Sequence, residues 1–154
     1  MSEPRNNRGA SKQDYETPWE LIRAVEQSFG ALSWDLACTG ANKKAPRGLT
    51  VDEDSLSQDW AKLDGHLWLN PPFENIGDWA RKCAASTGAR ITMLVPASID
   101  SRWFERYVHG IATVFSVAPR VKFVGAKDPY PKPLMLCAYG LTAPTKELQL
   151  WRWK

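Results

Sequence analysis

Residues 67–95 read LWLNPPFENIGDWARKCAASTGARITMLV, and this stretch decides the fold. It begins with a short apolar run, Leu67–Leu69, which two prolines end because proline cannot donate to a sheet ladder. Apolar side chains then recur across residues 76–84 at the spacing of one helix face. After Gly88, Ile91–Val95 is a continuous apolar run, which is typical of a buried parallel strand. The stretch therefore predicts a strand, a helix and a second strand.

Further elements are predicted on both sides of this unit. A capping box at Thr17–Glu20, with proline at the first helical position, predicts a helix that Gly30 ends. Residues 33–38 are predicted as a short buried strand, and the polar residues 39–60 as an irregular loop. The later elements expected are a helix over 101–108 and strands over 111–117, 121–124 and 134–139. The aromatic and cationic end, Leu150–Lys154, is either a last packed strand or a stacking surface, and we favour the strand.

Strands that alternate with helices indicate an open α/β sheet with right-handed crossovers. We predict one compact domain over residues 15–154, with a mainly parallel sheet and helices on its faces. The strands at Trp34–Cys38, Leu67–Leu69 and Ile91–Val95 are expected to lie side by side. Met1–Asp14 is polar and basic, which predicts a flexible tail that is either a plain solvated terminus or a loose tether for a polyanion.

The composition argues against several classes of protein. The chain has 154 residues, of which 44% are hydrophobic and 24% charged, as in an ordinary globular domain. No apolar run reaches the length of about 18 residues that a membrane span requires. The 3 cysteines stand far apart and only 2 histidines are present, so we expect no disulfide framework, no metal site and a reducing cytoplasm. The net charge of +3 permits contact with nucleic acid without requiring it.

Asn70-Pro71-Pro72-Phe73 directly follows a predicted strand, where an α/β sheet presents its ligand site. The two prolines fix two φ angles and remove two donors, which leaves carbonyl acceptors in a preset direction. Asn70 adds a side-chain acceptor and Phe73 a flat apolar face. Two acceptors beside an aromatic ring suit a planar group that carries an NH2, such as a nucleobase or a carboxamide. The alternative is a Pro-Pro turn with an asparagine cap and a core phenylalanine.

An ordered set of motifs resembles the phage-type DNA N6-adenine methyltransferases, the phage Dam family. The Asn-Pro-Pro-aromatic motif alone is shared with other amino-group methyltransferases, whereas the ordered set is more specific. The resemblance implies a Rossmann-like S-adenosylmethionine-dependent methyltransferase fold and methylation of adenine N6 in double-stranded DNA, in the cytoplasm of a bacterium or a phage-infected host cell. The motifs are Tyr15-Glu16-Thr17-Pro18, Trp34–Cys38, Asp52–Leu56 with Asp59-Trp60, Asn70–Phe73, Leu94–Ala97 and Arg120–Phe123.

The resemblance also implies a catalytic site at Asn70, Pro71, Pro72 and Phe73. Asn70 and the Pro71 carbonyl are expected to accept hydrogen bonds from the adenine amine. Because this amine is a poor nucleophile, the reaction needs positioning and electrostatics more than a general base. Phe73 is expected to stack on a base that has left the double helix.

Residues for S-adenosylmethionine are implied at several predicted element ends: Thr17, Pro18, Asp35, Ala37, Asp54 and Asn70. Free N–H groups at the first helix would hold the methionine carboxylate, Asp35 would face its ammonium, and Asp54 would lie near the adenosine. The alternatives are a plain helix start, a paired acid and a solvated acidic loop. Between Asp35 and Asn42 the only glycine is Gly40, so the Gly-x-Gly cradle of the wider methyltransferase class is missing.

Contacts with DNA phosphates are expected from exposed cations near the same edge: Arg102, Arg120, Lys122 and Lys132. With a net charge of only +3, the affinity should be modest and sensitive to salt. Two other functions stay open. One is a methyltransferase for another planar NH2, in an RNA base or a protein glutamine. The other is a catalytically inactive DNA-binding remnant, because the cofactor loop is poor in glycine.

Overall fold

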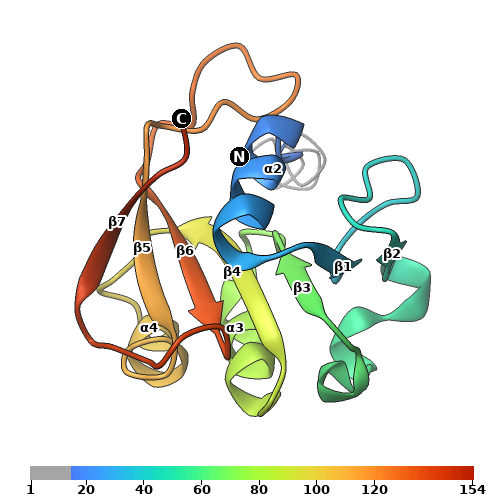
Figure 1. The fold of residues 1–154 in the computed structure, drawn as a ribbon. Helices are drawn as coiled ribbons and strands as arrows, with labels where there is room; N and C mark the ends of the chain where they lie inside the picture. Colours follow the sequence, from blue (N-terminus) through green and yellow to red (C-terminus); the bar gives the residue numbers. More distant parts are fainter. Residues whose placement is uncertain (1–14) are drawn as a thin grey trace, which may run out of the picture.

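The computed structural model describes residues 15–154, so the tail predicted at Met1–Asp14 lies outside the described residues. These residues form a seven-stranded sheet with the order β2-β1-β3-β4-β6-β5-β7 (Figure 1). Only β6 runs antiparallel to its neighbours, which confirms the mainly parallel sheet. The strands are β1 (Leu32–Asp35), β2 (Arg47–Gly48), β3 (His66–Leu69), β4 (Arg90–Pro96), β5 (Thr113–Ala118), β6 (Leu134–Tyr139) and β7 (Leu148–Arg152).

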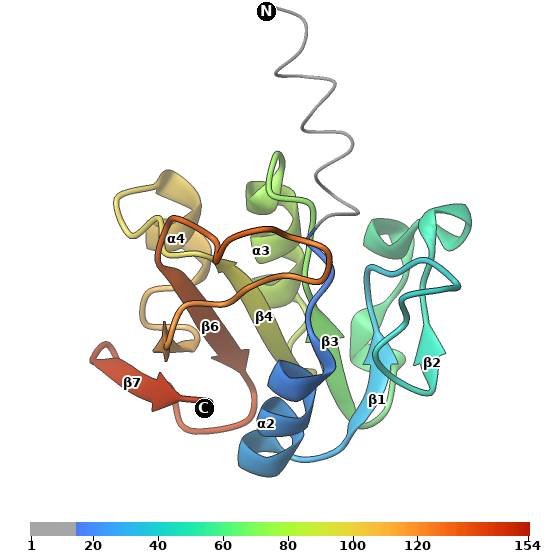
Figure 2. The ribbon, with the colours of Figure 1, turned by 90° about the horizontal axis from the view of Figure 1, so that it is seen from above.

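Helices cover both faces of the sheet, with α2 on one face and α3 and α4 on the other (Figure 2). Successive side chains of β3 point to opposite faces of the sheet: Leu67 and Leu69 are buried on the α3 side, and Trp68 is buried on the α2 side. None of the helices within residues 15–154 is long and apolar enough to cross a membrane. The helices are α2 (Trp19–Phe29), α3 (Ile76–Ala85), α4 (Arg102–Tyr107) and the short 3-10 helices η1 (Val51–Glu53), η2 (Ser55–Ser57) and η3 (Trp60–Lys62).

The carboxyl ends of β1, β3 and β4 meet at one edge of the sheet, as the sequence predicts (Figure 1). Asp35 is the last residue of β1, and Asn70 directly follows β3. Leu134, the first residue of β6, pairs with Pro96, the last residue of β4. The loop 119–133, which precedes β6, therefore lies at the same edge as Asp35 and Asn70.

Several predicted elements differ from the structure. The strand predicted over residues 33–38 is β1, which ends at Asp35, so Leu36–Cys38 follow it as loop. Residues 121–124 form no strand and pair with no other strand. The buried side chains of Val121 and Phe123 instead anchor the loop 119–133 in the core. The first helix begins at Trp19 with Pro18 as its N-cap and has no side-chain cap. The capping box predicted at Thr17 is therefore wrong, because the Thr17 hydroxyl accepts a hydrogen bond from Asn70 instead.

The segment 39–60 is more ordered than the predicted loop. It contains β2, η1, η2 and the start of η3. Gly48 in β2 lies so close to the segment after β1 that an added Cβ would stand 2.5 Å from Cys38 Sγ. At the other end of the chain, Leu148–Arg152 pairs with β5, so the favoured interpretation of the C-terminus as a packed strand is confirmed.

Candidate active site

A cavity of about 290 Å³ opens where β1 and β3 end. Most of its wall is apolar and includes Ala37, Val51 and Leu56; Asp54 and Asn70 are among its polar residues. Its volume is close to the lower limit of about 300 Å³ for a small-molecule pocket. Within residues 15–154, no group of three or more His, Cys, Asp and Glu side chains is placed to hold a metal ion.

A smaller polar cavity of about 40 Å³ adjoins the larger one. Ala37, Asn42 and Asn70 line both cavities, so the two are neighbours that share these residues as a wall. Thr17 and Asp35 line only the smaller cavity. Lys44 lines it too, as does Glu16, the second of the described residues. Of the residues that the sequence assigns to the cofactor, only Pro18 lines neither cavity; it caps α2.

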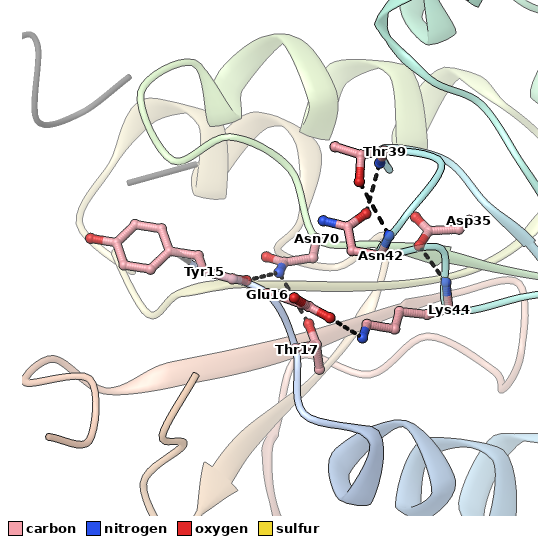
Figure 3. Close-up of polar contacts among 8 residues, drawn as sticks. All are labelled: Tyr15, Glu16, Thr17, Asp35, Thr39, Asn42, Lys44 and Asn70. Atoms are coloured by element: carbon pink, nitrogen blue, oxygen red, sulfur yellow. Dashed lines mark hydrogen bonds and ion pairs between the residues drawn. The ribbon is translucent and has the colours of Figure 1, made fainter. Parts of the chain in front are cut away.

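Asn70 presents an acceptor that has no partner. Its Nδ2 donates to the carbonyl oxygen of Tyr15 over 2.7 Å and to Thr17 Oγ1 over 3.1 Å (Figure 3). The Tyr15 carbonyl can only accept, so these contacts fix which end of the amide carries the nitrogen. The Oδ1 atom on the other end is buried and has no hydrogen-bond partner among residues 15–154. An unpaired buried acceptor costs about 1–3 kcal/mol, which makes Oδ1 a place where a ligand donor is stabilising.

Asp35 holds the loop that follows β1. Its Oδ1 accepts from the backbone N–H of Ala37 over 3.2 Å, and its Oδ2 accepts from the N–H of Lys44 over 3.0 Å. Desolvation by burial raises the pKa of Asp35 to about 6, and the backbone hydrogen bonds and Lys44 oppose this rise. The carboxylate is thus both a support for the cavity wall and a buried charge beside the polar cavity.

The glycine-poor loop is held by side chains. The backbone N–H of Thr39 donates to Asn42 Oδ1 over 2.7 Å, and the N–H of Asn42 donates to Thr39 Oγ1 over 3.2 Å. These reciprocal bonds and those of Asp35 order the turn without a Gly-x-Gly sequence. The position that does require glycine for close approach is Gly48, which sequence reasoning missed because it lies outside the segment where the cradle was expected.

Lys44 and Glu16 form an ion pair at the smaller cavity. Lys44 is 4% exposed, and its Nζ lies 2.7 Å from Glu16 Oε2. The same Nζ lies 4.4 Å from the centre of the Trp19 ring. Sequence reasoning assigned no role to this lysine, because nothing in a polar stretch indicates which of two adjacent lysines is buried. Glu16 appeared only as part of a motif.

The predicted stacking residue Phe73 lies in a cluster of aromatic rings. Tyr15 stacks on it with ring centres 4.9 Å apart and planes 25° apart. Phe123 and Tyr130, both from the loop 119–133, turn their rings edge-on to Phe73 at 6.5 and 5.8 Å. One face of Phe73 is therefore covered by Tyr15, which sequence reasoning did not foresee.

The four cations predicted to meet phosphates are all exposed at the carboxyl edge. Arg102 begins α4, and Arg120, Lys122 and Lys132 belong to the loop 119–133. Arg120 differs from the others because its Nη1 donates to the carbonyl oxygens of Tyr130 and Pro131. This guanidinium ties the two ends of the loop together, so part of its donor capacity is already used.

The chain is similar in sequence to known proteins of one family. Residues 5–132 match the family described as DNA N-6-adenine-methyltransferase (Dam). A curated relative, the DNA N-6-adenine-methyltransferase of Escherichia phage T1, is 29% identical over 101 residues, which are 64% of this chain and 42% of the relative. The chain therefore spans less than half the length of that relative.

Proposed function

Because the chain belongs to the DNA N-6-adenine-methyltransferase (Dam) family, we propose that it methylates the N6 amine of adenine in double-stranded DNA. The observation that carries this proposal is the buried Oδ1 of Asn70, which has no hydrogen-bond partner within residues 15–154 and belongs to a residue that lines a ligand-sized cavity. An acceptor in that position matches an NH2 donor. The family is one of methyltransferases, which implies S-adenosylmethionine as the methyl donor.

The two cavities fit the two halves of S-adenosylmethionine. The larger one is mainly apolar, with Asp54 at its wall, and suits the adenosine. The smaller one has the charged groups of Asp35 and Lys44, and suits an amino acid. When bound, the cofactor supplies an electrophilic methyl group on a sulfonium. Asn70 lines both cavities, so it stands where the methyl donor and the acceptor amine have to meet.

The role proposed for Asn70 and the two prolines is to orient the adenine amine. An adenine amine is a weak nucleophile because its lone pair is delocalised into the ring. Acceptors on Asn70 Oδ1 and the Pro71 carbonyl would bind its two hydrogens and favour a tetrahedral nitrogen with a localised lone pair. Asn70 is not titratable at physiological pH, so this site works by positioning and electrostatics and requires no general base from this residue.

The target base has to leave the double helix to reach Asn70. Phe73, three residues further along the same turn, would stack on the base. Because Tyr15 already covers one face of Phe73, its ring would have to move aside, or the base would stack on the outer face of Tyr15. Arg102, Lys122 and Lys132 are exposed at this edge of the sheet and would contact phosphates. Arg120 would act mainly by holding the loop 119–133 in place.

Transfer of a labelled methyl group tests the proposal. The protein is incubated with labelled S-adenosylmethionine and, separately, duplex DNA, RNA of the same sequence, or a glutamine peptide. We expect N6-methyladenine in the duplex only. Label in RNA or in the peptide would instead support a different NH2 substrate. Cofactor and DNA binding without any transfer would support an inactive remnant.

The aromatic cluster predicts a specific defect for Phe73→Leu. Stacking of a base on an aromatic ring contributes about 1–3 kcal/mol, so the KM for DNA should rise roughly 5- to 150-fold. The affinity for S-adenosylhomocysteine should stay unchanged, because Phe73 lines neither cavity. Tyr130→Leu removes a ring from the same cluster but not from the turn after β3, and serves as the matched control. An equal KM defect in both variants would show that the cluster acts only as packing.

The buried carboxylate predicts a pH dependence of cofactor affinity. Because the pKa of Asp35 is raised to about 6, the group is ionised above pH 6 and protonated below it. Only the ionised form attracts an ammonium, so S-adenosylhomocysteine should bind up to about tenfold more weakly for each pH unit below 6. Asp35→Asn should flatten this dependence in calorimetric titrations from pH 5 to 7. A wild-type slope in the Asn variant would contradict the assignment of Asp35.

A further inference from the structure

We propose that Lys44 binds the carboxylate of the amino-acid portion of the cofactor, and that Glu16 holds the lysine in place when no ligand is bound. The proposal rests on the proposed function, since it concerns the same cofactor. It assigns the carboxylate to a buried cation, whereas the sequence suggests the start of the first helix.

The first argument is the unused hydrogen-bonding capacity of a buried ammonium. A lysine ammonium has three donors. Within residues 15–154, Glu16 Oε2 is the one acceptor in hydrogen-bond contact with Lys44 Nζ, at 2.7 Å. The Trp19 ring covers another side, at 4.4 Å from the ring centre. Lys44 is only 4% exposed, and a buried charge is costly unless it is paired and hydrogen-bonded. A second anion at Nζ is therefore stabilising.

The second argument is the position of the ammonium. Lys44 lines the polar cavity together with Thr17, Asp35 and Asn70. Its side chain runs from the loop after β1 toward Glu16 and Thr17 (Figure 3). This cavity adjoins the larger one, with which it shares Ala37, Asn42 and Asn70. A ligand with adenosine in the larger cavity would extend its amino-acid end toward Lys44.

The third argument is the order of charges. Asp35 and Glu16 are carboxylates that contact different parts of Lys44: the backbone N–H of Lys44 donates to Asp35 Oδ2, and its ammonium pairs with Glu16. An α-amino acid has an ammonium and a carboxylate on the same carbon. The carboxylate of Asp35 is complementary to the ligand ammonium, and the ammonium of Lys44 is complementary to the ligand carboxylate. The hydrogen bond from the Lys44 backbone to Asp35 keeps these two charged residues next to each other. At the helix start, by contrast, the N-cap is Pro18, which has no N–H, so one of the usual backbone donors is missing there.

The test compares two ligands that differ only at this end. S-Adenosylhomocysteine has the amino-acid portion, whereas 5′-methylthioadenosine has the same adenosine and thioether without it. In Lys44→Met, which keeps the apolar stem, the affinity for S-adenosylhomocysteine should fall about 10- to 100-fold. The affinity for 5′-methylthioadenosine should change less than about twofold. Lys43→Met is the matched control, because the preceding lysine is exposed and should affect neither ligand.

The outcomes separate this proposal from the proposed function. Equal losses for both ligands in Lys44→Met would overturn the assignment, because the lysine would then support only the cavity wall. If this variant melts too early to be titrated, Glu16→Gln replaces it. Removing the competing carboxylate should increase the preference for S-adenosylhomocysteine over 5′-methylthioadenosine, and an unchanged or lower preference would overturn the proposal. Wild-type protein that binds neither ligand would overturn the proposed function itself.

Discussion

Replacing Asn70 with alanine is expected to lower the rate of methyl transfer roughly 100- to 1,000-fold, and to lower cofactor affinity by a much smaller factor, because the residue also lines both cavities. Within residues 15–154 the buried Oδ1 atom has no hydrogen-bond partner, and in the proposed reaction it accepts from the adenine amine. Losing one well-placed partner of a developing charge commonly costs about 3–4 kcal/mol in the transition state. Single-turnover assays on adenine-containing duplexes, with S-adenosylhomocysteine binding measured in parallel, test both halves of this expectation.

Asn70→Asp is a revealing companion, because the amide has two roles. Aspartate keeps an acceptor at Oδ1, but its other oxygen has no proton to donate to the carbonyl of Tyr15, which now lies 2.7 Å from Nδ2. We expect activity between that of the wild type and that of the alanine variant, together with a lower melting temperature. This geometry makes aspartate a less conservative replacement than its shape suggests.

The matched control is Asn75→Ala. Asn75 is an exposed asparagine just beyond the same turn, and its Oδ1 accepts from Trp79 Nε1 over 3.3 Å. Its loss should leave methyl transfer within about twofold of the wild type. Full activity in Asn70→Ala would mean that the turn after β3 is only a scaffold, and the proposed adenine chemistry at this turn would be wrong.

The central elements were predictable because burial imposes a local period. β3 and β4 are buried on both faces, so their residues form continuous apolar runs, and α3 is buried on one face, so its apolar residues follow the helical repeat. Asn70 could be found from the same information, since it directly follows β3, whereas Asp35 was assigned from the family resemblance, because the predicted strand over residues 33–38 runs past it. The rule that ligands bind at the carboxyl ends of parallel strands then brought them together.

The features that were missed depend on partners far away in the sequence. Thr17 has the residue type of an N-cap, but its hydroxyl instead accepts from Asn70, 53 positions away. The burial of Lys44 depends on Glu16, 28 positions away. Val121 and Phe123 alternate as a strand would, yet they anchor a loop. In each case the local pattern permits two structures, and a contact between distant segments selects one of them.

Trp60→Ala is expected to have the largest effect on stability, with a loss of about 3–5 kcal/mol in the free energy of unfolding. Trp60 is completely buried, and its ring stacks on Trp79 at 6.1 Å between ring centres. Its Nε1 donates to the carbonyl oxygen of Ser55 over 3.0 Å and lies 3.2 Å from Ser55 Oγ. Ser55 and Leu56 line the larger cavity, so this one tryptophan connects the core to the proposed adenosine site. Denaturant unfolding measures the loss.

Trp60→Phe separates the packing of the ring in the core from its hydrogen bond to Ser55 at the larger cavity. Phenylalanine keeps an aromatic ring against Trp79 but cannot donate to Ser55. The Ser55 carbonyl keeps the backbone N–H of Gln58 as a donor, so the loss is that of one hydrogen bond, about 0.5–1.5 kcal/mol. Because η2 would then be held less firmly, S-adenosylhomocysteine and 5′-methylthioadenosine should lose affinity by the same factor. This equal loss is opposite to the selective loss expected for Lys44→Met, so the two variants identify the adenosine end and the amino-acid end of the site independently. A destabilised Trp60→Phe protein with both affinities intact would show that Ser55 and Leu56 are held without the tryptophan.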